Sequence, residues 1–456
     1  MSRPALLRGI AQIEPRERAA VTLALLCYFM LLGSYYILRP VRDTLATAFG
    51  PEQLELLFTG TFLGSLAASP LYAALAARIT LRRLLPGVFW FFLLDVLGFA
   101  ALLRADPQSR WVAGVYFVWL SVSNLFMLSV FWSLMADLFR PAQATRLYGL
   151  ITAGGTLGAI AGPVATRFAV RAIGLDGLLL AAAAGFGVVI ALIHLLMREK
   201  ARLGASGAEV QRSTLEQGLP GNPFEGFGEV ARSAYTRNQA AFMFLMTWVN
   251  TVAYFFQTEL IAKSFTGVAG RAVAVADIAL AVNICTAIVL IFGLGRILAR
   301  FGVTTGLVLN PVIMMGAFVV IAVFPTVLMI EALQVVRSVS QYAIARPSRE
   351  ICFTVVEQNS RYKAKNVIDT VVYRLGDMTS AWMQAGLRWA GLALPGSAAV
   401  GVGMSLVWGA AALLLGRRYE ALRHEAIRGE ALRQEVLRGE GKQALPAGLD
   451  SQLEID

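Results

Sequence analysis

Four polar side chains share one face of the apolar segment that begins at residue 19. At about 100° per residue, Tyr28, Tyr35, Arg39 and Arg42 fall within about 60° of one another. Arginine presents a planar fork that pairs bidentately with carboxylate or phosphate, so this face predicts anion binding. Arg39 lies a turn deeper than Arg42 and is the better ligand candidate. Extension of either side chain to the lipid headgroups is the competing interpretation.

Three later apolar segments carry polar stripes of the same kind. Their members are Thr247, Asn250, Tyr254 and Gln257 in the seventh segment; Glu331, Gln334, Ser338 and Gln341, with Arg337 beside them, in the tenth; and Asn366, Asp369, Tyr373, Asp377, Ser380 and Gln384, with Arg374 beyond them, in the eleventh. Ionisable side chains are costly inside a membrane, so such stripes are typical of a water-filled binding site. We expect the substrate to be bound by Tyr35, Arg39, Arg42, Asn250, Tyr254, Gln334, Arg337, Tyr373 and Arg374.

Charged residues in or near these stripes are candidates for coupling or gating: Asp43, Asp137, Arg146, Glu331, Asp369 and Asp377. Asp369, Asp377 and Glu331 take up protons if transport is proton-coupled, which the residues leave open. Arg337 with Glu331, and Arg374 with Asp377, are alternatively buried locks between helices. The tyrosines either stack on a planar base or only line the cavity. Asp137, with Arg140 and Arg146, has the pattern of a cytoplasmic lock.

The elements that must position these residues are apolar and of membrane length. The chain is 57% hydrophobic and only 15% charged, against about 25% charged in soluble domains, so lipid is its expected solvent. About twelve stretches are each long enough to cross a hydrocarbon core of about 30 Å. We predict spans at 19–41, 55–77, 84–103, 112–136, 148–170, 177–197, 239–261, 272–295, 304–323, 326–345, 366–388 and 393–415. The predicted class is an all-α polytopic membrane protein.

Charge and composition exclude several other classes. The net charge of +11 follows the loops instead of forming one patch, which argues against nucleic-acid binding. Three cysteines predict no disulfide framework, and two histidines are too few for a histidine metal site. A Walker motif and a nucleophile–base pair are both missing, so we predict no enzyme activity, no cofactor and no ATP-driven transport. Nothing in the sequence specifies an oligomeric state.

The chain divides into two halves. Residues 1–197 form a predicted N-terminal six-helix half, 198–238 a cytoplasmic linker, 239–416 a C-terminal six-helix half, and 417–456 a charged, helix-prone cytoplasmic tail. The halves echo each other in their loops, as in transporters with two pseudo-repeats and a site near the midplane between them. Lys and Arg concentrate in one set of loops, which places both termini in the cytoplasm.

Three stretches resemble the ATP/ADP translocase (nucleotide transporter) family. They are Ser34-Tyr35-Tyr36-Ile37-Leu38-Arg39-Pro40-Val41-Arg42-Asp43; Phe131-Trp132 followed by Arg146-Leu147-Tyr148; and Arg361-Tyr362-Lys363-Ala364-Lys365 followed by Tyr373-Arg374-Leu375-Gly376-Asp377. The resemblance covers nearly the whole chain in topology. Arg42 matches a basic position of the family, but Asp377 stands where some members have Lys. Span four lacks the family's intramembrane Glu near Trp119 to Asn124, and span seven lacks one near Ala253.

The resemblance implies a major-facilitator-type fold and a divergent bacterial branch, with the protein expected in the inner (plasma) membrane. It implies a secondary transporter that works by alternating access and exchanges or imports ATP, ADP or a related phosphorylated anion. One alternative is a major facilitator transporter of another solute, such as a peptide, sugar phosphate or drug, with or without protons. Another is a membrane scaffold or lipid-handling protein that transports nothing.

Overall fold

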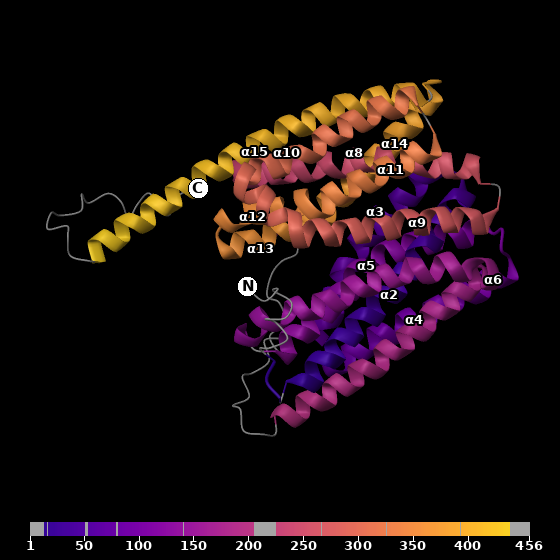
Figure 1. Cartoon of the computed structure of the whole chain (residues 1–456), viewed down its shortest axis with the longest axis horizontal. Coiled ribbons are helices and arrows are strands. Elements are labelled where there is room, and N and C mark those ends of the chain that lie inside the picture. The colour runs from indigo at the N-terminus through magenta and orange to yellow at the C-terminus, as the bar shows by residue number, and fades with distance from the viewer. Residues whose placement is uncertain are drawn as a thin grey trace. The chain divides into compact units, whose positions relative to one another are not determined.

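The computed structural model describes residues 13–15, 17–50, 53–78, 81–139, 141–204, 225–265, 267–324, 326–392 and 394–437. Every regular element in these ranges is a helix (Figure 1), which confirms the predicted all-α class. Among the described residues, seven stretches are long and apolar enough to cross a membrane. Two of them, Arg146–Arg202 and Val268–Val323, have 57 and 56 residues, enough for two crossings each.

The described chain forms two compact units. The first contains the described parts of 1–220, 253–287 and 326–335, and the second those of 221–252, 288–325 and 336–456. The first unit holds α2 (Arg18–Phe49), α3 (Leu54–Arg78), α4 (Leu81–Ala105), α5 (Arg110–Leu138), α6 (Pro141–Gly204) and nearly all of α9 (Val268–Ile288). It also takes the end of α8 (Ala234–Ser264) and the start of α11 (Val327–Val339).

The second unit holds the remaining elements. They are α7 (Glu225–Arg232), the first part of α8, η2 (Val289–Gly293), α10 (Leu294–Val323), the end of α11, η3 (Ser340–Ala345), α12 (Arg346–Cys352), η4 (Phe353–Val355), α13 (Gln358–Val367), η5 (Ile368–Val372), α14 (Tyr373–Trp389) and α15 (Leu394–Leu437). Helices α10 and α15 pack side by side (Figure 1). The predicted division into halves at 198–238 stays a prediction.

Glycines mark two of the predicted boundaries between spans. Gly174 breaks α6 with φ 69°, and Gly302 breaks α10 with φ 77°. Residues other than glycine rarely adopt such positive φ values. The chain turns there without an irregular loop, so α6 and α10 each consist of two helical segments that meet at a kink. The last helix extends to Leu437, well beyond the predicted end at residue 415, so the described part of the charged tail is helical.

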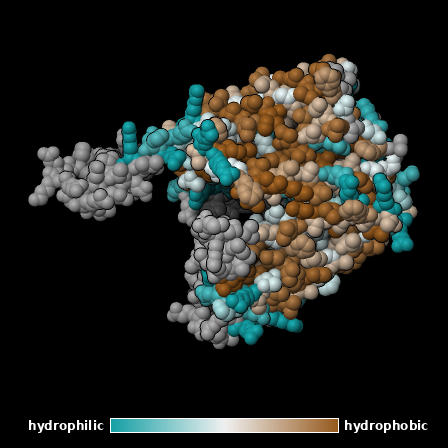
Figure 2. Space-filling view, in the orientation of Figure 1, coloured by the Kyte–Doolittle hydropathy of each residue, from teal (hydrophilic) through white to brown (hydrophobic). Residues whose placement is uncertain are grey.

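Close helix packing organises the first unit. A Cβ added to Gly158 of α6 would lie 2.2 Å from the Phe29 carbonyl oxygen of α2, and one on Gly162 would lie 2.6 Å from that of Gly33. Only hydrogen at these positions lets the two backbones approach so closely, as in other membrane helix pairs. Much of the face drawn in Figure 2 is apolar (brown), and Phe91 and Leu94 are examples of exposed apolar side chains of the first unit.

Candidate substrate-binding site

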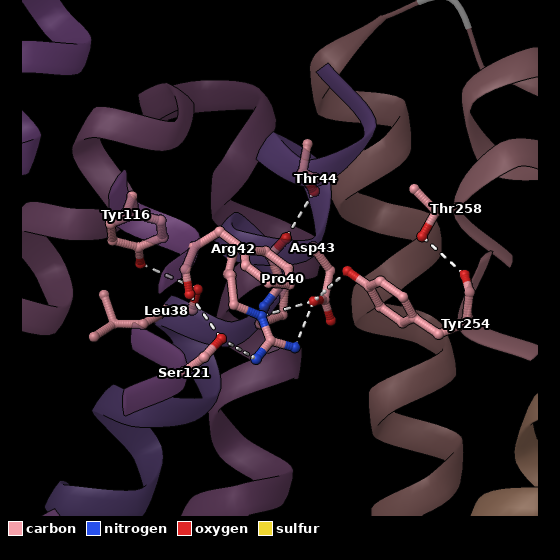
Figure 3. Close-up of polar contacts among 10 residues, drawn as sticks. Leu38, Pro40, Arg42, Asp43, Thr44, Tyr116, Ser121, Tyr254 and Thr258 are labelled. Atoms are coloured by element: carbon pink, nitrogen blue, oxygen red, sulfur yellow. Dashed lines mark hydrogen bonds and ion pairs between the residues drawn. The ribbon is translucent and has the colours of Figure 1, made fainter. Parts of the chain in front are cut away.

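The first polar cluster is built on α2, where Arg42 and Asp43 follow Pro40 (Figure 3). Arg42 donates Nε and Nη2 to Asp43 Oδ1 at 2.9 and 2.6 Å, and Nη1 to Ser121 Oγ at 3.4 Å. The Tyr254 hydroxyl donates to the same carboxylate oxygen at 3.2 Å. The guanidinium also lies over the Phe117 ring, 5.1 Å from its centroid. Arg42 is therefore fixed in the protein interior, which argues against extension to the headgroups.

The other polar residues of α2 have aromatic surroundings. The Arg39 guanidinium carbon lies 5.8 Å from the centroid of the Tyr36 ring, and Tyr35 meets that ring edge-on at 5.4 Å. Tyr28 stacks on Phe131 at 4.4 Å, with 11° between the ring planes. Tyr28 thus belongs to the packed core of the first unit. Arg39 and Arg42 are the cationic residues of the polar face predicted for this helix.

A second cluster is built around Arg337 in the second unit. Its Nη1 donates to Asn250 Oδ1 at 2.8 Å and to Gln341 Oε1 at 3.2 Å, and its Nη2 donates to Ser338 Oγ at 3.0 Å. Asn250 Nδ2 is buried and forms no hydrogen bond within the described residues. Buried amide donors normally have an acceptor, so this one marks a place for a water or a ligand oxygen.

Asp377 of α14 forms the third cluster, also in the second unit. Its Oδ1 accepts the Thr251 hydroxyl at 2.7 Å, and its Oδ2 accepts Arg374 Nη1 at 3.3 Å. The Arg374–Asp377 pairing that the sequence left as an alternative is thus present. Tyr373 lies beside it, with the Arg374 guanidinium carbon 5.3 Å from its ring centroid.

The remaining candidates of α11 lie in the first unit. Gln334 is buried and donates Nε2 to the Ala253 carbonyl of α8 at 3.0 Å. Glu331, one turn earlier, is half-buried. Arg337, by contrast, belongs to the second unit and donates to Asn250, Gln341 and Ser338, which also lie in that unit.

Arg349 is a site residue that sequence reasoning missed. Its side chain is only 3% exposed, and it donates to Asp369 Oδ1 at 2.6 Å and to Glu350 Oε1 at 3.0 Å. Lys365 bonds the other oxygen of Glu350. Asp369, expected to line the site, is therefore tied to α12. The available signal was Glu350, an acidic residue directly after Arg349 in a predominantly basic loop.

The pKa of Glu350 reflects this network, which lies beyond the predicted tenth span. Burial acts to raise it, but the hydrogen bond from Lys365 and the charge of Arg349 outweigh burial. The net effect is a pKa below the ordinary value of 4.5. The carboxylate is thus held ionised between two cations.

Arg146 ties the start of α6 to the residues before α2. Its Nη2 donates to Glu17 Oε1 at 2.6 Å and lies 3.5 Å from Glu14 Oε1, and Gln143 Nε2 donates to Glu17 at 2.7 Å. The side chain of Asp137, its predicted partner, lies outside the described side chains, as does Arg140.

Comparison with known proteins gives one family and several similar folds. The model of the Major Facilitator Superfamily matches residues 24–345. No curated protein gives a match. A bacterial homologue of the human lysosomal transporter Spinster, solved inward-facing and unoccupied, is 16% identical with a TM-score of 0.57, covering 90% of this chain and 97% of its own.

Two other solved structures are similar over comparable lengths. The nucleoside transporter NupG is 13% identical with a TM-score of 0.58, covering 90% of this chain and 99% of its own. A POT family transporter in complex with a thioalcohol-conjugated peptide is 11% identical with a TM-score of 0.60, covering 88% of this chain and 96% of its own. At these identities the likeness carries the fold and leaves the substrate open.

Proposed function

Because this chain belongs to the Major Facilitator Superfamily, we propose that it is a secondary transporter that works by alternating access and exchanges or imports nucleotides or a related phosphorylated anion. Membership supports membrane transport of a small molecule in general. The anionic substrate is the finer proposal, and it rests on the chemistry of the buried charges.

The observation that carries the proposal is an excess of guanidinium groups in the polar clusters. The clusters on α2 and on α8, α11 and α14 contain Arg39, Arg42, Arg337 and Arg374. Only two carboxylates, Asp43 and Asp377, belong to the same clusters. Burying net positive charge is costly, and a phosphorylated substrate offsets that cost with bidentate acceptors.

Neighbouring side chains support this role by orienting the cations. Asn250 and Gln341 hold the Arg337 fork by two hydrogen bonds, and Asp43 and Ser121 hold that of Arg42. A preorientated guanidinium loses less side-chain freedom when a substrate binds. The buried, unbonded Nδ2 of Asn250 adds a donor for a substrate oxygen.

The remaining candidate roles complete the proposal. Asp43, Asp369, Asp377 and Glu331 are coupling residues if protons accompany the anion, and Arg146 and Asp137 belong to a cytoplasmic gate. Alternating access would take place between the halves 1–197 and 239–416. The protein would lie in a bacterial inner membrane with both termini in the cytoplasm.

The test is uptake of labelled nucleotide into proteoliposomes loaded with ATP or ADP. We expect exchange in the wild type and its loss in Arg337→Gln and Arg39→Ala. Arg296→Gln is the control, because Arg296 is exposed and donates to the Phe292 carbonyl of its own helical turn. A uniform loss in all three variants would indicate misfolding instead of a lost site.

A binding assay separates the remaining alternatives. A ligand that binds the folded state raises the melting temperature by mass action. If saturating ATP and ADP neither exchange nor raise it, the nucleotide proposal is wrong. A response to a peptide, sugar phosphate or drug would then identify another transported solute, and no response in the whole library would favour the scaffold alternative.

A further inference from the structure

Asp95 places a carboxyl group at the middle of a membrane-spanning helix. It is the tenth residue of the apolar stretch Pro86–Ala105 in α4, so about 14 Å of helix separates it from Pro86. The side chain is half-buried, and the adjacent Leu94 and Leu97 are exposed on the apolar face. An ionised carboxylate at this depth is costly unless a cation or several donors compensate it.

The compensation at Asp95 is a single neutral donor. Trp119 Nε1 of α5 donates to Asp95 Oδ2 at 2.8 Å. Within the described part of the chain, Asp95 forms this one hydrogen bond and no ion pair. Oδ1 is left to carry a proton, which makes the group neutral and removes the cost of charge in hydrocarbon.

The helices packed against α4 place no cationic side chain at the depth of Asp95 in their described parts. Helix α5 has Tyr116 as its one titratable side chain between residues 111 and 136. Helix α6 approaches at Gly187, whose added Cβ would lie 3.8 Å from Leu93 Cδ1. It has no titratable side chain between Gly177 and Ile193, and His194 beyond them bonds the Ile190 carbonyl at 2.7 Å. On α4 itself, Arg104 lies nine residues away at the helix end.

A chain of contacts joins Asp95 to the cluster on α2. Trp119 stacks on Tyr116, with 6.0 Å between ring centroids and 29° between planes. The buried Tyr116 hydroxyl donates to the Leu38 carbonyl at 3.2 Å (Figure 3), one turn before Arg42. A change at Asp95 that moves the Trp119 indole therefore reaches the segment of α2 that holds Arg42 and Asp43.

From this geometry we infer that Asp95 is a proton-binding site of the transport cycle. The proton comes from water, binds Oδ1 and returns to water, while Trp119 and Tyr116 pass the change of charge to α2. The inference goes beyond the nucleotide proposal, because it names a coupling group on α4 and holds for any transported solute. It does rest on the chain being a transporter.

Infrared difference spectroscopy of the purified, substrate-free protein tests the protonation directly. We expect a protonated-carboxyl band that changes in intensity with pH and is absent from Asp95→Asn. Asparagine keeps an oxygen for Trp119, so this variant should fold. Asp106→Asn is the control, because Asp106 is exposed and its carboxylate accepts the nearby Gln108 N–H at 3.2 Å, so its loss should leave the band intact.

Solute uptake against external pH then tests the coupling. A single site changes its protonated-to-ionised ratio about tenfold per pH unit, so wild-type uptake should vary strongly over the pH range in which the infrared band titrates, and Asp95→Asn should flatten the profile to within about twofold. Trp119→Phe should shift the midpoint of the pH profile upward, because the ionised Asp95 carboxylate loses the hydrogen bond from Trp119 Nε1. A band that persists in Asp95→Asn, or a profile that this variant leaves unchanged, overturns the inference.

The two experiments fail in different ways. If nucleotides are the wrong substrate, uptake of nucleotide is absent, but the infrared titration of Asp95 is unaffected. If Asp95 only anchors the indole, nucleotide exchange proceeds, and Trp119→Phe lowers the melting temperature without moving any midpoint.

Discussion

Side-chain oxygen atoms of the same helix and of neighbouring helices hold the buried arginines of this protein. Arg374 and Asp377 show how the cost of a buried charge is met: their side chains are 13% and 9% exposed, and Thr251 adds a second donor to the carboxylate. Removing one partner of such a pair leaves the other charge buried and uncompensated. That loss typically costs about 3–5 kcal/mol.

Asp377→Ala should therefore lower the free energy of unfolding by about 3–5 kcal/mol, because Arg374 loses its carboxylate. The melting temperature should fall accordingly. Replacing both partners, in Asp377→Asn with Arg374→Gln, should restore most of the stability. Glu259→Gln is the control: its ion pair with Lys263 is on the surface, with Lys263 64% exposed, and should contribute under about 1 kcal/mol. Equal losses in Asp377→Ala and Glu259→Gln would contradict the buried-lock interpretation.

The lowered pKa of Glu350 predicts how the stability of the second unit depends on pH. Its pKa in the folded protein lies below the ordinary 4.5, so the folded state binds this proton less readily than the unfolded chain. Its contribution is present above about pH 4.5 and is lost as the pH falls through the lowered pKa. Melting curves should show wild type losing stability on acidification more steeply than Glu350→Gln. Parallel curves for the two proteins would refute this.

Individual site residues were predictable where the chemistry was local. Arg42 with Asp43, and Arg374 with Asp377, are one and three positions apart, so the sequence displays each pair directly. Arg349 was not predictable, because its partner Asp369 is 20 positions away and burial depends on how α12 meets η5. Asp95 was missed for the same reason: Trp119 is 24 positions away.

At the scale of elements, glycine spacing decides which helices pack. Gly154, Gly158 and Gly162 recur every four residues on α6, and added Cβ atoms there would lie 2.2 to 2.6 Å from carbonyl oxygens of α2. These glycines form a ridge of small residues that permits close packing against α2. The backbone contact leaves no room for even one methyl group.

Gly158→Ala should therefore destabilise the first unit by at least about 1–3 kcal/mol, because the two backbones must separate. Gly149→Ala is a matched control on the same helix, since nothing lies within 4 Å of its added Cβ. Alanine also favours helix over glycine, so this control should be neutral or slightly stabilising. Thermal melting of both variants in detergent gives the comparison, and similar melting temperatures would exclude the proposed ridge contact.

The sequence predicts the positions of the helices along the chain better than it predicts where an α-helix gives way to π-helical turns. Apolar length alone places each span, because hydrocarbon forbids unsatisfied backbone. Stripes drawn at about 100° per residue assume a regular α-helix. Helix turns widen at η3, which contains Gln341, and at η5, which contains Asp369. Such wide π turns shift the face that later residues share, are frequent at functional sites, and have no simple sequence signature.

At the scale of the whole molecule, basic residues divide the loops into two classes. Arg361, Lys363 and Lys365 follow the tenth predicted span, whereas the loop Asp106–Ser109 carries no basic residue. Positive loops stay in the cytoplasm during insertion. This asymmetry predicts the side of the membrane on which each loop lies, independently of substrate.

Single cysteines can test that topology in a chain whose own Cys27, Cys285 and Cys352 are replaced. Ser109→Cys should react with a membrane-impermeant maleimide in intact cells, because its loop is predicted to face outward. Ser360→Cys, at the start of α13, should react only after the membrane is opened. Both should label equally in detergent, which controls for local accessibility. Labelling of Ser360→Cys in intact cells would contradict the predicted orientation and would place the loop that contains Arg361, Lys363 and Lys365 outside the cell.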